Sequence, residues 1–319
     1  MDHERFRDWF SRVDELTAAQ RKAVAAVLSE PPEGAASLAA IELGVDDERR
    51  CPHCGAGGAV SRGKARGLRR FRCKECRKTF SALTGTALSG LHHKERWLAF
   101  STSLAEGETI KQSAERCGIA PSTAHRWRHR FLAAVRQAPD RLAGIVEADE
   151  TFVLESRKGE RKLNRKPRRR GGKARKPGLS REQVPVLVAA DRGGATLSHT
   201  LPALNADSVK EILEPVLAPD ALLVSVANRC YPPVAAALDV PHESINASAG
   251  ERVRGAVHIQ TVNSRHSQIK GFLRGFRGIA TKYLDSYLRW FHLIELGEQP
   301  SPRACLEAAM ARPCLRFAN

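Results

Sequence analysis

The amino-acid sequence predicts an α+β protein of several domains: a helical start, a small cysteine-bearing module, a helical region and a larger mixed α/β domain. Three observations predict this. Two Cys-x-x-Cys pairs lie close together in the first third of the chain. A glycine then separates two helix-forming segments, and from residue 144 apolar stretches with strand character alternate with helical ones. Hydrophobic residues make up 42% of the chain, which is enough for packed cores.

The charge of the chain indicates a polyanionic partner. The net charge is +17 and the sequence pI is about 10.0. An enzyme of small metabolites does not need that excess, whereas a protein that binds nucleic acid does, because each neutralised phosphate releases counterions. A ribosome-associated or merely basic protein is the alternative. The clustering of the lysines and arginines favours nucleic-acid binding.

We expect residues 1–47 to form an N-terminal helical segment. Apolar residues near helical spacing predict an amphipathic helix over residues 4 to 28, which the run Pro31-Pro32-Glu33-Gly34 should break. The apolar residues are Phe6, Trp9, Phe10, Val13 and Leu16. Charges interrupt this segment, so it resembles neither a signal peptide nor a membrane span, and no membrane partner is expected.

A zinc ribbon is predicted over residues 48–90. Cys51 and Cys54 are separated from Cys73 and Cys76 by eighteen residues, and each pair forms a turn that aims two thiolates at one point. Redox chemistry is the alternative, but a redox pair would not come doubled. The other four cysteines are scattered (Cys117, Cys230, Cys305, Cys314), which indicates free thiols in a reducing cytoplasm and not a disulfide framework. His53 is expected to be a spectator.

Six basic residues between the cysteine pairs predict a hairpin that contacts backbone phosphates. They are Arg62, Lys64, Arg66, Arg69, Arg70 and Arg72.

A helix-turn-helix is predicted within residues 91–138. Thr109 to Cys117 would form the first helix, Gly118 the turn and Pro121 to Phe131 the second helix, with Ser122 or Thr123 as its N-cap. A basic helix after a glycine turn suits a reader of the DNA major groove. An ordinary αα-hairpin in a basic protein is the alternative.

The second of these helices should bury Ala124, Trp127 and Phe131, which recur at i, i+3 and i+7. Its other face would carry Thr123, His125, Arg126, Arg128, His129 and Arg130. Of these, we expect DNA contacts from Thr123, His125, Arg126, Arg128 and Arg130.

Residues 144–296 predict a ribonuclease-H-like domain. The order of its elements is strand, hairpin, helix, strand, helix, strand and two closing helices, which is typical of that fold. The expected ranges are strands 144–153, 184–190, 195–201, 221–226 and 242–245, and helices 205–217, 232–238, 260–276 and 280–296. Residues 297–319 are expected to be a helical or frayed C-terminal tail.

A basic loop interrupts this domain after its first strand. Residues 157 to 176 hold twelve lysines and arginines among glycines and prolines, so they predict a loop and not a regular element. We expect it to follow the DNA backbone, with contacts from Arg168, Arg169 and Arg170. A loop that only confers solubility is the alternative.

Several motifs carry a family resemblance. They are Val146-Glu147-Ala148-Asp149-Glu150-Thr151-Phe152, Glu155 to Gly159, His258 to Ser267, Gly278 to Leu284 and Tyr287 to Trp290. These resemble the insertion-sequence transposases that have an N-terminal zinc ribbon and an Asp-Asp-Asn-Lys version of the DDE motif. The resemblance covers roughly residues 48 to 296.

The resemblance implies three catalytic residues. Asp149 matches the first metal-binding acid, Asn263 the third position, and Lys270 the lysine that could hold a DNA phosphate. Lys270 follows Asn263 by seven residues, so both would share one helix face. Taken alone, Asp149 could be a buried structural acid and Lys270 a solvated surface residue.

The second acid of the motif is replaced. The family has Asp-Gly before Asn-Arg and Tyr-Pro, and here Val226 and Ala227 stand there, with 36 residues between Val226 and Asn263. Valine suits a strand but cannot bind a metal ion, so we expect the fold to survive and the metal site to fail. Other acids are Asp191, expected to be a turn former, Asp220 and Asp239.

The implied activity is transposition. Such a protein would bind double-stranded DNA, both the terminal inverted repeats and the target, as a homo-oligomer in the bacterial cytoplasm at the nucleoid. It would contain structural Zn²⁺ and use Mg²⁺ or Mn²⁺ to cleave and join strands. Because of Val226, this copy is expected to be impaired, and a non-catalytic DNA-binding protein (a decayed transposase or repressor) is the alternative. A zinc-ribbon transcription factor with an unrelated C-terminal domain is disfavoured by Asp149, Asn263 and Lys270.

Overall fold

The fold is taken from a computed structural model, in which a defined part of the chain is described. The described residues are 5, 7–8, 11–18, 20–21, 33–45, 48–135, 139, 141–163, 165–168, 171–176, 178–246, 249–276, 278–295 and 301–311. Much of the helix predicted over residues 4 to 28 lies outside these ranges, as does Cys314. Within them, Val13–Glu15 form a short 3-10 helix, η1.

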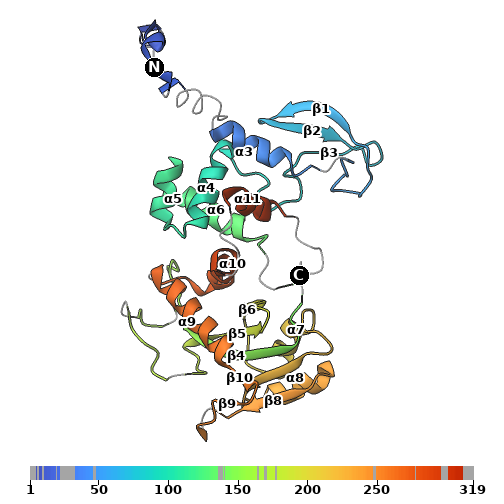
Figure 1. The fold of residues 1–319 in the computed structure, drawn as a ribbon, viewed down its shortest axis with the longest axis vertical. Helices are drawn as coiled ribbons and strands as arrows, with labels where there is room; N and C mark the ends of the chain where they lie inside the picture. The colour runs from blue at the N-terminus through green and yellow to red at the C-terminus, as the bar shows by residue number, and fades with distance from the viewer. Residues whose placement is uncertain are drawn as a thin grey trace.

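The upper half of the molecule combines the ribbon with a group of helices (Figure 1). Strands β1 (Val60–Ala65), β2 (Leu68–Arg72) and β3 (Thr79–Phe80) form a three-stranded antiparallel sheet. The helices are α3 (Glu33–Glu42), η2 (Lys94–Arg96), α4 (Trp97–Ala105), α5 (Ile110–Cys117), α6 (Pro121–Leu132) and α11 (Pro302–Met310). Glu33 and Gly34, which were predicted to be part of a helix-breaking run, lie inside α3, whereas Pro31 and Pro32 lie outside the described residues.

Aromatic side chains form the centre of this helical core. Trp97 and Phe100 of α4 pack edge to face against Trp127 and Phe131 of α6, with ring centroids 5.0 to 6.4 Å apart. All four are essentially inaccessible to water. Aromatic rings provide a large apolar area and favour these edge-to-face contacts. The predicted inward face of the second helix is therefore confirmed.

The start of α6 differs from the prediction. Ala120 is the N-cap residue and Pro121 the first helical residue, so Ser122 and Thr123 lie inside the helix and cap nothing. A proline whose φ angle suits the first turn begins the helix without a side-chain cap. The preceding helix, α5, is as predicted: Thr109 forms a capping box with Gln112, and Gly118 ends the helix with a φ of 57°.

The lower half contains a five-stranded mixed sheet. Its strands are β4 (Ile145–Leu154), β5 (Gln183–Asp191), β6 (Thr196–Thr200), β7 (Leu222–Val226) and β8 (His242–Ile245), in the order β6-β5-β4-β7-β8. The β4–β5 and β5–β6 pairs are antiparallel, whereas β4–β7 and β7–β8 are parallel. The order of strands along the chain is the one predicted. A small hairpin, β9 (Val253–Arg254) and β10 (Val257–His258), was not predicted.

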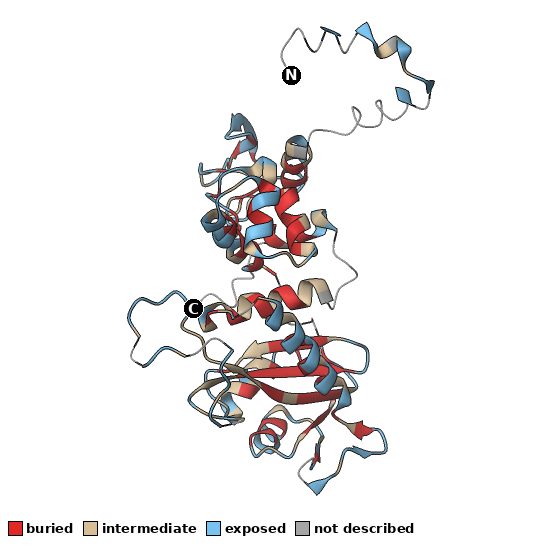
Figure 2. Ribbon diagram, turned by 90° about the vertical axis from the view of Figure 1, so that its left-hand side faces the viewer, coloured by how far each residue is buried: buried red, intermediate tan, exposed pale blue. Residues whose placement is uncertain are grey.

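Helices cover both faces of this sheet. One core packs α7 (Ala206–Leu213) and α8 (Tyr231–Leu238) against the sheet, and the other packs α9 (Gln260–Gly275) and α10 (Leu284–Glu295) against its opposite face. A 3-10 turn, η4 (Thr281–Tyr283), precedes α10. Buried strands lie between exposed outer helix faces, as Figure 2 shows. Along β4, even-numbered residues such as Ala148 face the α8 side, and odd-numbered ones such as Ile145 face the α9 side.

Helix α10 joins the two halves. In α10, Leu284, Leu288 and Phe291 face the sheet, while Tyr287 and Trp290 enter the helical core above. Trp290 also donates from Nε1 to the main-chain oxygen of Leu104, at 2.8 Å. None of the described helices is long and apolar enough to cross a membrane.

Candidate active site and metal centre

Four cysteines converge at one end of the ribbon. The Sγ atoms of Cys51, Cys54, Cys73 and Cys76 all lie within 4.8 Å of one another. The Cys51–Cys76 and Cys54–Cys73 sulfur pairs are each 3.6 Å apart. Four sulfurs about 2.3 Å from one tetrahedral zinc ion would be separated by roughly 3.8 Å. The donor set therefore fits a structural zinc ion.

The local backbone explains this convergence. The main-chain nitrogen of Cys51 donates to Ala56, and that of Cys73 donates to Lys78, so each cysteine pair sits on a closed turn. A main-chain hydrogen bond from Cys76 lowers the pKa of the Cys73 thiol to about 7, whereas contacts with the other three thiols contribute to raising the pKa of Cys76 to about 12, so the four thiols do not ionise together. His53 is not part of the sulfur cluster, in line with its prediction as a spectator.

Some of the basic residues of the ribbon hairpin form contacts with other parts of the protein. Arg62, Lys64 and Arg70 are exposed. Arg69 instead pairs with Glu42 of α3, whose carboxylate accepts from Arg69 Nε at 2.7 Å. This ion pair ties the ribbon to the helical core. Arg66 is exposed as well, whereas Arg72 is half-buried and its Nε donates to the main-chain oxygen of Arg77 at 3.3 Å.

The outward face of α6 is smaller than predicted. The prediction that Arg128 faces outward is wrong, because its side chain is fully buried. Arg128 Nη2 donates to the main-chain oxygen of Glu108 at 2.6 Å, and its guanidinium carbon lies 4.4 Å from the centroid of the Trp290 ring. Helix periodicity from the sequence assigned this cation to the surface, and a partner ring 162 residues away could not be foreseen.

The other residues of α6 that were predicted to contact DNA differ in their exposure and in their contacts within the protein. Arg126 is exposed and Thr123 is half-buried. Arg130 is exposed, but its guanidinium donates to the main-chain oxygens of Ala87 and Ser89. His125 lies 5.4 Å from the Tyr283 ring, between centroids. Arg126 is thus the exposed residue of this set that has neither a ring contact nor a main-chain contact with another described part of the chain.

His129 joins α6 to the sheet domain. Its ring stacks on Tyr283, with centroids 3.9 Å apart and planes 18° from parallel. Burial lowers the pKa of His129 to about 4, and the charges of His125, Arg128 and Lys282 act in the same direction. The imidazole is therefore neutral and serves as an aromatic surface between the two halves.

Asp149 lies near the middle of β4 on the face covered by α9. Its carboxylate Oδ1 accepts from the main-chain nitrogen of Glu150 at 2.8 Å, and its side chain is 16% exposed. Burial raises the pKa of Asp149 to about 7, and the Glu150 charge adds to this, whereas Lys270 opposes it. A carboxylate that is costly to ionise alone is suited to a cation partner.

Val226 neighbours Asp149 on the adjacent strand. The parallel β4–β7 register pairs Glu147 with Val224 and Ala148 with Ser225. One further step along this register pairs Asp149 with Val226, the last residue of β7. Paired residues on parallel strands point to the same face, and Val226, at the end of its strand, packs against the cores on both sides of the sheet. A carboxylate at position 226 would therefore lie beside Asp149.

Helix α9 presents Asn263, His266 and Lys270 at intervals that share one face. Asn263 and Lys270 are exposed, while His266 lies beneath the helix with its Nδ1 atom 3.9 Å from Oδ2 of Asp149. Burial lowers the pKa of His266 to about 4, with Lys270 acting in the same direction. His266 was not selected from the sequence, although its spacing from Asn263 and Lys270 already placed it on their face.

Glu147 anchors this helix to the sheet. Its carboxylate is fully buried and accepts from Thr261 Oγ1 at 2.8 Å and from the main-chain nitrogen of Val262 at 3.0 Å. Arg192 lies 3.0 Å from the same carboxylate. An acid at a helix N-terminus compensates unpaired N–H groups and the helix dipole. Glu147, two residues before Asp149 on β4, therefore holds the start of α9 against the sheet.

The remaining acids do not supply a second carboxylate beside Asp149. Glu150 points to the opposite face and accepts from Tyr231 Oη at 2.6 Å. Asp191 accepts from the main-chain nitrogens of Ala143 and Ala195, which supports the prediction of a turn former. Asp220 is 83% exposed, and Asp239 ends α8 in the left-handed region. Among the described residues, only the four cysteines form a cluster of three or more metal-binding groups of the His, Cys, Asp and Glu types.

Two divalent ions do not fit the groups around Asp149. A two-metal site needs several carboxylate oxygens to offset the charge of the ions. Here one carboxylate, one amide and a valine stand at the three positions. The residues present thus disagree with a complete two-metal centre.

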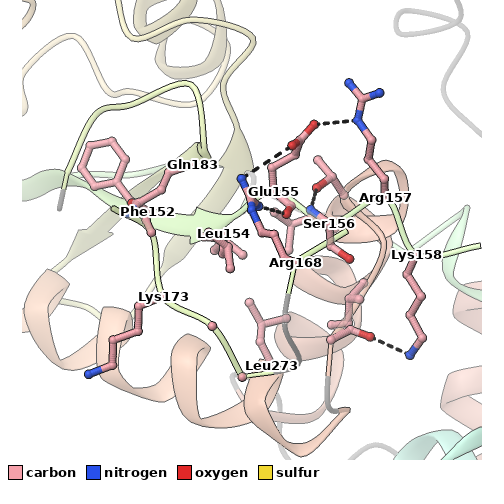
Figure 3. Close-up of a pocket in the computed structure, with 18 of the residues that line it drawn as sticks. Phe152, Leu154, Glu155, Ser156, Arg157, Lys158, Arg168, Lys173, Gln183 and Leu273 are labelled. Carbon is pink, nitrogen blue, oxygen red and sulfur yellow. Dashed lines mark hydrogen bonds and ion pairs between the residues drawn. The ribbon is translucent and has the colours of Figure 1, made fainter. Parts of the chain in front are cut away.

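The basic loop is folded onto an acidic residue at the end of β4. Glu155 pairs with Arg157 at 3.0 Å, Arg165 at 3.5 Å and Arg168 at 3.9 Å, as Figure 3 shows in part. Arg168 also lies 3.7 Å from Glu182 and is 22% exposed. Arg169 and Arg170 lie outside the described residues. The loop, the end of β4 and α9 surround a cavity of about 1110 Å³, which Lys270 and Arg274 also line.

Comparison with known proteins identifies the family. The family described as "ISXO2-like transposase domain" matches residues 141–292, and a "homeodomain-like domain" matches residues 93–136. An "uncharacterized protein in transposable element ISH50" of Halobacterium salinarum is 31% identical over 248 residues, covering 76% of this chain and 84% of that protein.

Two solved assemblies show weaker likeness. A chain of the simian T-cell lymphotropic virus intasome in complex with PP2A regulatory subunit B56 gamma is 10% identical, with a TM-score of 0.30 over 61% of this chain and 68% of that one. A chain of the pre-cleavage Mos1 transpososome is 13% identical, with a TM-score of 0.24 over 66% and 78%. Scores this low carry no structural argument. On the sequence relationship, the chain belongs to the insertion-sequence transposases, and its residues 141–292 match the ISXO2-like transposase domain.

Proposed function

We propose that this protein binds the terminal inverted repeats of its element and belongs, by descent, to the enzymes that cleave and join DNA strands there. The zinc ribbon and the helix-turn-helix would bind the ends, and the sheet domain would hold the cleavage site. The strand order β6-β5-β4-β7-β8, antiparallel up to β4 and parallel beyond it, supports a ribonuclease-H-like assignment for this domain. The helices on both faces agree with it.

The observation that carries the proposal is the position of Asp149 beneath α9. The helix brings Lys270 close enough for its charge to act on the Asp149 carboxylate. In a transposase, Asp149 and Asn263 would hold a divalent cation, and Lys270 would bind a phosphate near the bond to be cut. Bound Mg²⁺ or Mn²⁺ would supply activation of the attacking oxygen and stabilisation of the leaving one. Asp149 would lose its proton when the cation binds.

We further propose that this copy is impaired in strand cleavage. Val226 occupies the strand position next to Asp149, where a second carboxylate would face the same ions. An apolar side chain there removes a negative charge and leaves a hydrophobic surface. The fold tolerates the valine because β7 is a buried strand.

DNA contacts would come from three surfaces. These are the exposed cations of the ribbon hairpin, Arg126 and the exposed start of α6, and the basic loop that follows β4. Double-stranded DNA, both element ends and target, is the proposed partner, in a bacterial cytoplasm and at the nucleoid. Two ends must be held together for transposition, so a homo-oligomer on DNA is proposed as well.

A non-catalytic DNA-binding protein is the second candidate. Val226 is the observation that favours it, because a decayed transposase could still occupy the element ends and repress transcription from them. The two candidates share their DNA contacts and differ only in cleavage.

The decisive experiment compares cleavage by the protein with cleavage by its Val226→Asp/Ala227→Gly variant. The substrate is a DNA fragment carrying the element's own end, with Mg²⁺ or Mn²⁺ and with zinc retained in the ribbon. We expect both proteins to bind the fragment and only the variant to cut it. Adding Asp149→Asn to the variant should abolish cutting, which controls for contaminating nucleases.

Each outcome decides between the candidates. Cleavage by the unaltered protein would contradict the role given to Val226. End binding without cleavage by either protein would favour the non-catalytic candidate. Loss of sequence-specific binding in both would reject the proposed function itself.

A further inference from the structure

His266 is a buried polar residue at the candidate active site for which no role has been described above. It lies on α9, three residues after Asn263 and four before Lys270, and its side chain is 10% exposed. Two buried apolar residues of the same helix, Val262 and Ile269, flank it toward the sheet. A histidine in such a stripe is ordinarily a core residue with satisfied hydrogen bonds.

The imidazole of His266 is satisfied at one of its two nitrogens only. Its Nε2 atom is buried and has no hydrogen-bond partner among the described residues. Its Nδ1 atom lies on the Asp149 side, 3.9 Å from the carboxylate Oδ2, and the imidazole also interacts with the main chain of Asp149. Burying a polar nitrogen without a partner costs free energy, so such a group calls for an explanation such as a bound ion.

We propose that Asp149, Asn263 and His266 form a binding site for one divalent transition-metal cation, with His266 as a ligand that partly replaces the missing acid. The site provides carboxylate oxygen, amide oxygen and imidazole nitrogen. Mixed nitrogen and oxygen ligands favour Mn²⁺ and later transition metals over Mg²⁺, which prefers oxygen alone. The inference rests on the proposed function only for the identity of Asp149 and Asn263 as ligands.

Two features of the geometry support this assignment. Residues at i and i+3 of a helix project side by side, so Asn263 and His266 can approach one ion from the same direction. Two donors about 2.1 Å from one ion are separated by roughly 3.0 Å at a right angle and by about 4.2 Å when opposite. The 3.9 Å between His266 Nδ1 and Asp149 Oδ2 lies within that span.

Lys270 is the charged neighbour that opposes a cation here. Its positive charge acts on Asp149 and His266 alike. Lys270 is exposed and lines the cavity beside the basic loop, so its amine can turn toward solvent or a phosphate. The flexible side chain therefore leaves room for an ion at Asp149.

The test uses Mn²⁺ as the probe on the full-length protein with zinc in the ribbon. Mn²⁺ binding is followed by the loss of the free-ion electron paramagnetic resonance signal. Pulsed measurements on the bound ion then report coupling to nitrogen. We expect Mn²⁺ to bind with nitrogen coupling, and His266→Gln to remove this coupling and weaken binding by about tenfold or more.

His292→Gln is the matched control. His292 is a largely buried histidine on α10 that is bonded to Ser198, at 2.8 Å. This variant should keep both the affinity and the nitrogen coupling. If His266→Gln does not fold, Asp149→Asn gives the same information, since it removes the other ligand at the site and should abolish the nitrogen-coupled signal.

Two results would overturn the inference. One is bound Mn²⁺ without nitrogen coupling in the unaltered protein. The other is unchanged affinity and coupling in both His266→Gln and Asp149→Asn, which would reduce His266 to a packing residue. Neither readout requires DNA or cleavage. The metal site can therefore be disproved while the proposed function stands, and the proposed function can be disproved while the metal site stands.

Discussion

At the scale of single residues, Asp149 stands out because its position costs stability. Its pKa is raised from 3.8 to about 7, mainly by burial. The folded protein therefore holds this proton more tightly than the unfolded chain does. The resulting penalty is absent below about pH 4, grows as the pH rises toward 7 and is complete above pH 7. A cation bound to the ionised Asp149 carboxylate would offset this loss of stability.

Asp149→Asn should consequently stabilise the protein at alkaline pH in the absence of Mg²⁺ and Mn²⁺. Each pKa unit corresponds to about 1.4 kcal/mol, and water reaches part of the side chain, so we expect a gain of about 2 kcal/mol at pH 8 and none near pH 4. Urea unfolding at several pH values measures this. Asp220→Asn, at an exposed site, is the control. A gain that does not change with pH would contradict the explanation.

At the scale of elements, α6 has one face that packs in the core and another that is proposed to contact DNA. Arg128 is fully buried against Trp290, whereas Arg126 two positions earlier is exposed. The two arginines are identical in chemistry and differ only in which way the helix turns them. They therefore separate the contribution of α6 to stability from its contribution to DNA binding.

Replacing each arginine by alanine should give opposite effects. Arg128→Ala leaves a void and an unpaired Glu108 oxygen, so we expect a loss of about 2–4 kcal/mol in the free energy of unfolding. Arg126→Ala should change stability by less than about 0.5 kcal/mol, yet weaken DNA binding and reduce its salt dependence. Urea unfolding and fluorescence anisotropy with a DNA fragment measure the two effects. Similar stability losses for both variants would contradict the assigned orientations.

The sequence was sufficient for elements whose signals are local. The strands of the mixed sheet, the glycine turn before α6 and the paired cysteines follow from apolar alternation, a positive φ angle and ligand spacing. It was insufficient where a residue's environment comes from distant parts of the chain. Arg128 is buried by Trp290 of α10, and Glu147 is bound by the start of α9. The unsatisfied imidazole of His266 likewise becomes visible only when α9 lies on β4.

At the scale of the whole molecule, the two ends of the chain complete one core. Helix α11 packs against α3, α4 and α6, and its Leu306 and Ala309 are fully buried there. In α10, Trp290 faces the same helical core while Phe291 faces the sheet. The helical half therefore depends on α10 and α11, which lie far along the chain from its other helices. A tail that the sequence left without a role thus contributes to the core of the opposite half.

Leu306→Ala should therefore destabilise the helical half of the protein. Removing a fully buried leucine side chain costs about 2–5 kcal/mol, and the loss should appear in the unfolding of the segment that contains Trp97 and Trp127. Tryptophan fluorescence during urea unfolding reports on that segment. Glu307→Ala is the matched control, because the neighbouring Glu307 has a 53% exposed side chain and, within the described part of the chain, forms an ion pair with Arg303 alone. Equal unfolding midpoints for the two variants would show that α11 does not stabilise this core. A lower midpoint for Leu306→Ala alone would show that α11 stabilises the helical half of the protein. Removal of α11 should then weaken binding to the ends of the DNA element without changing the surroundings of Asp149.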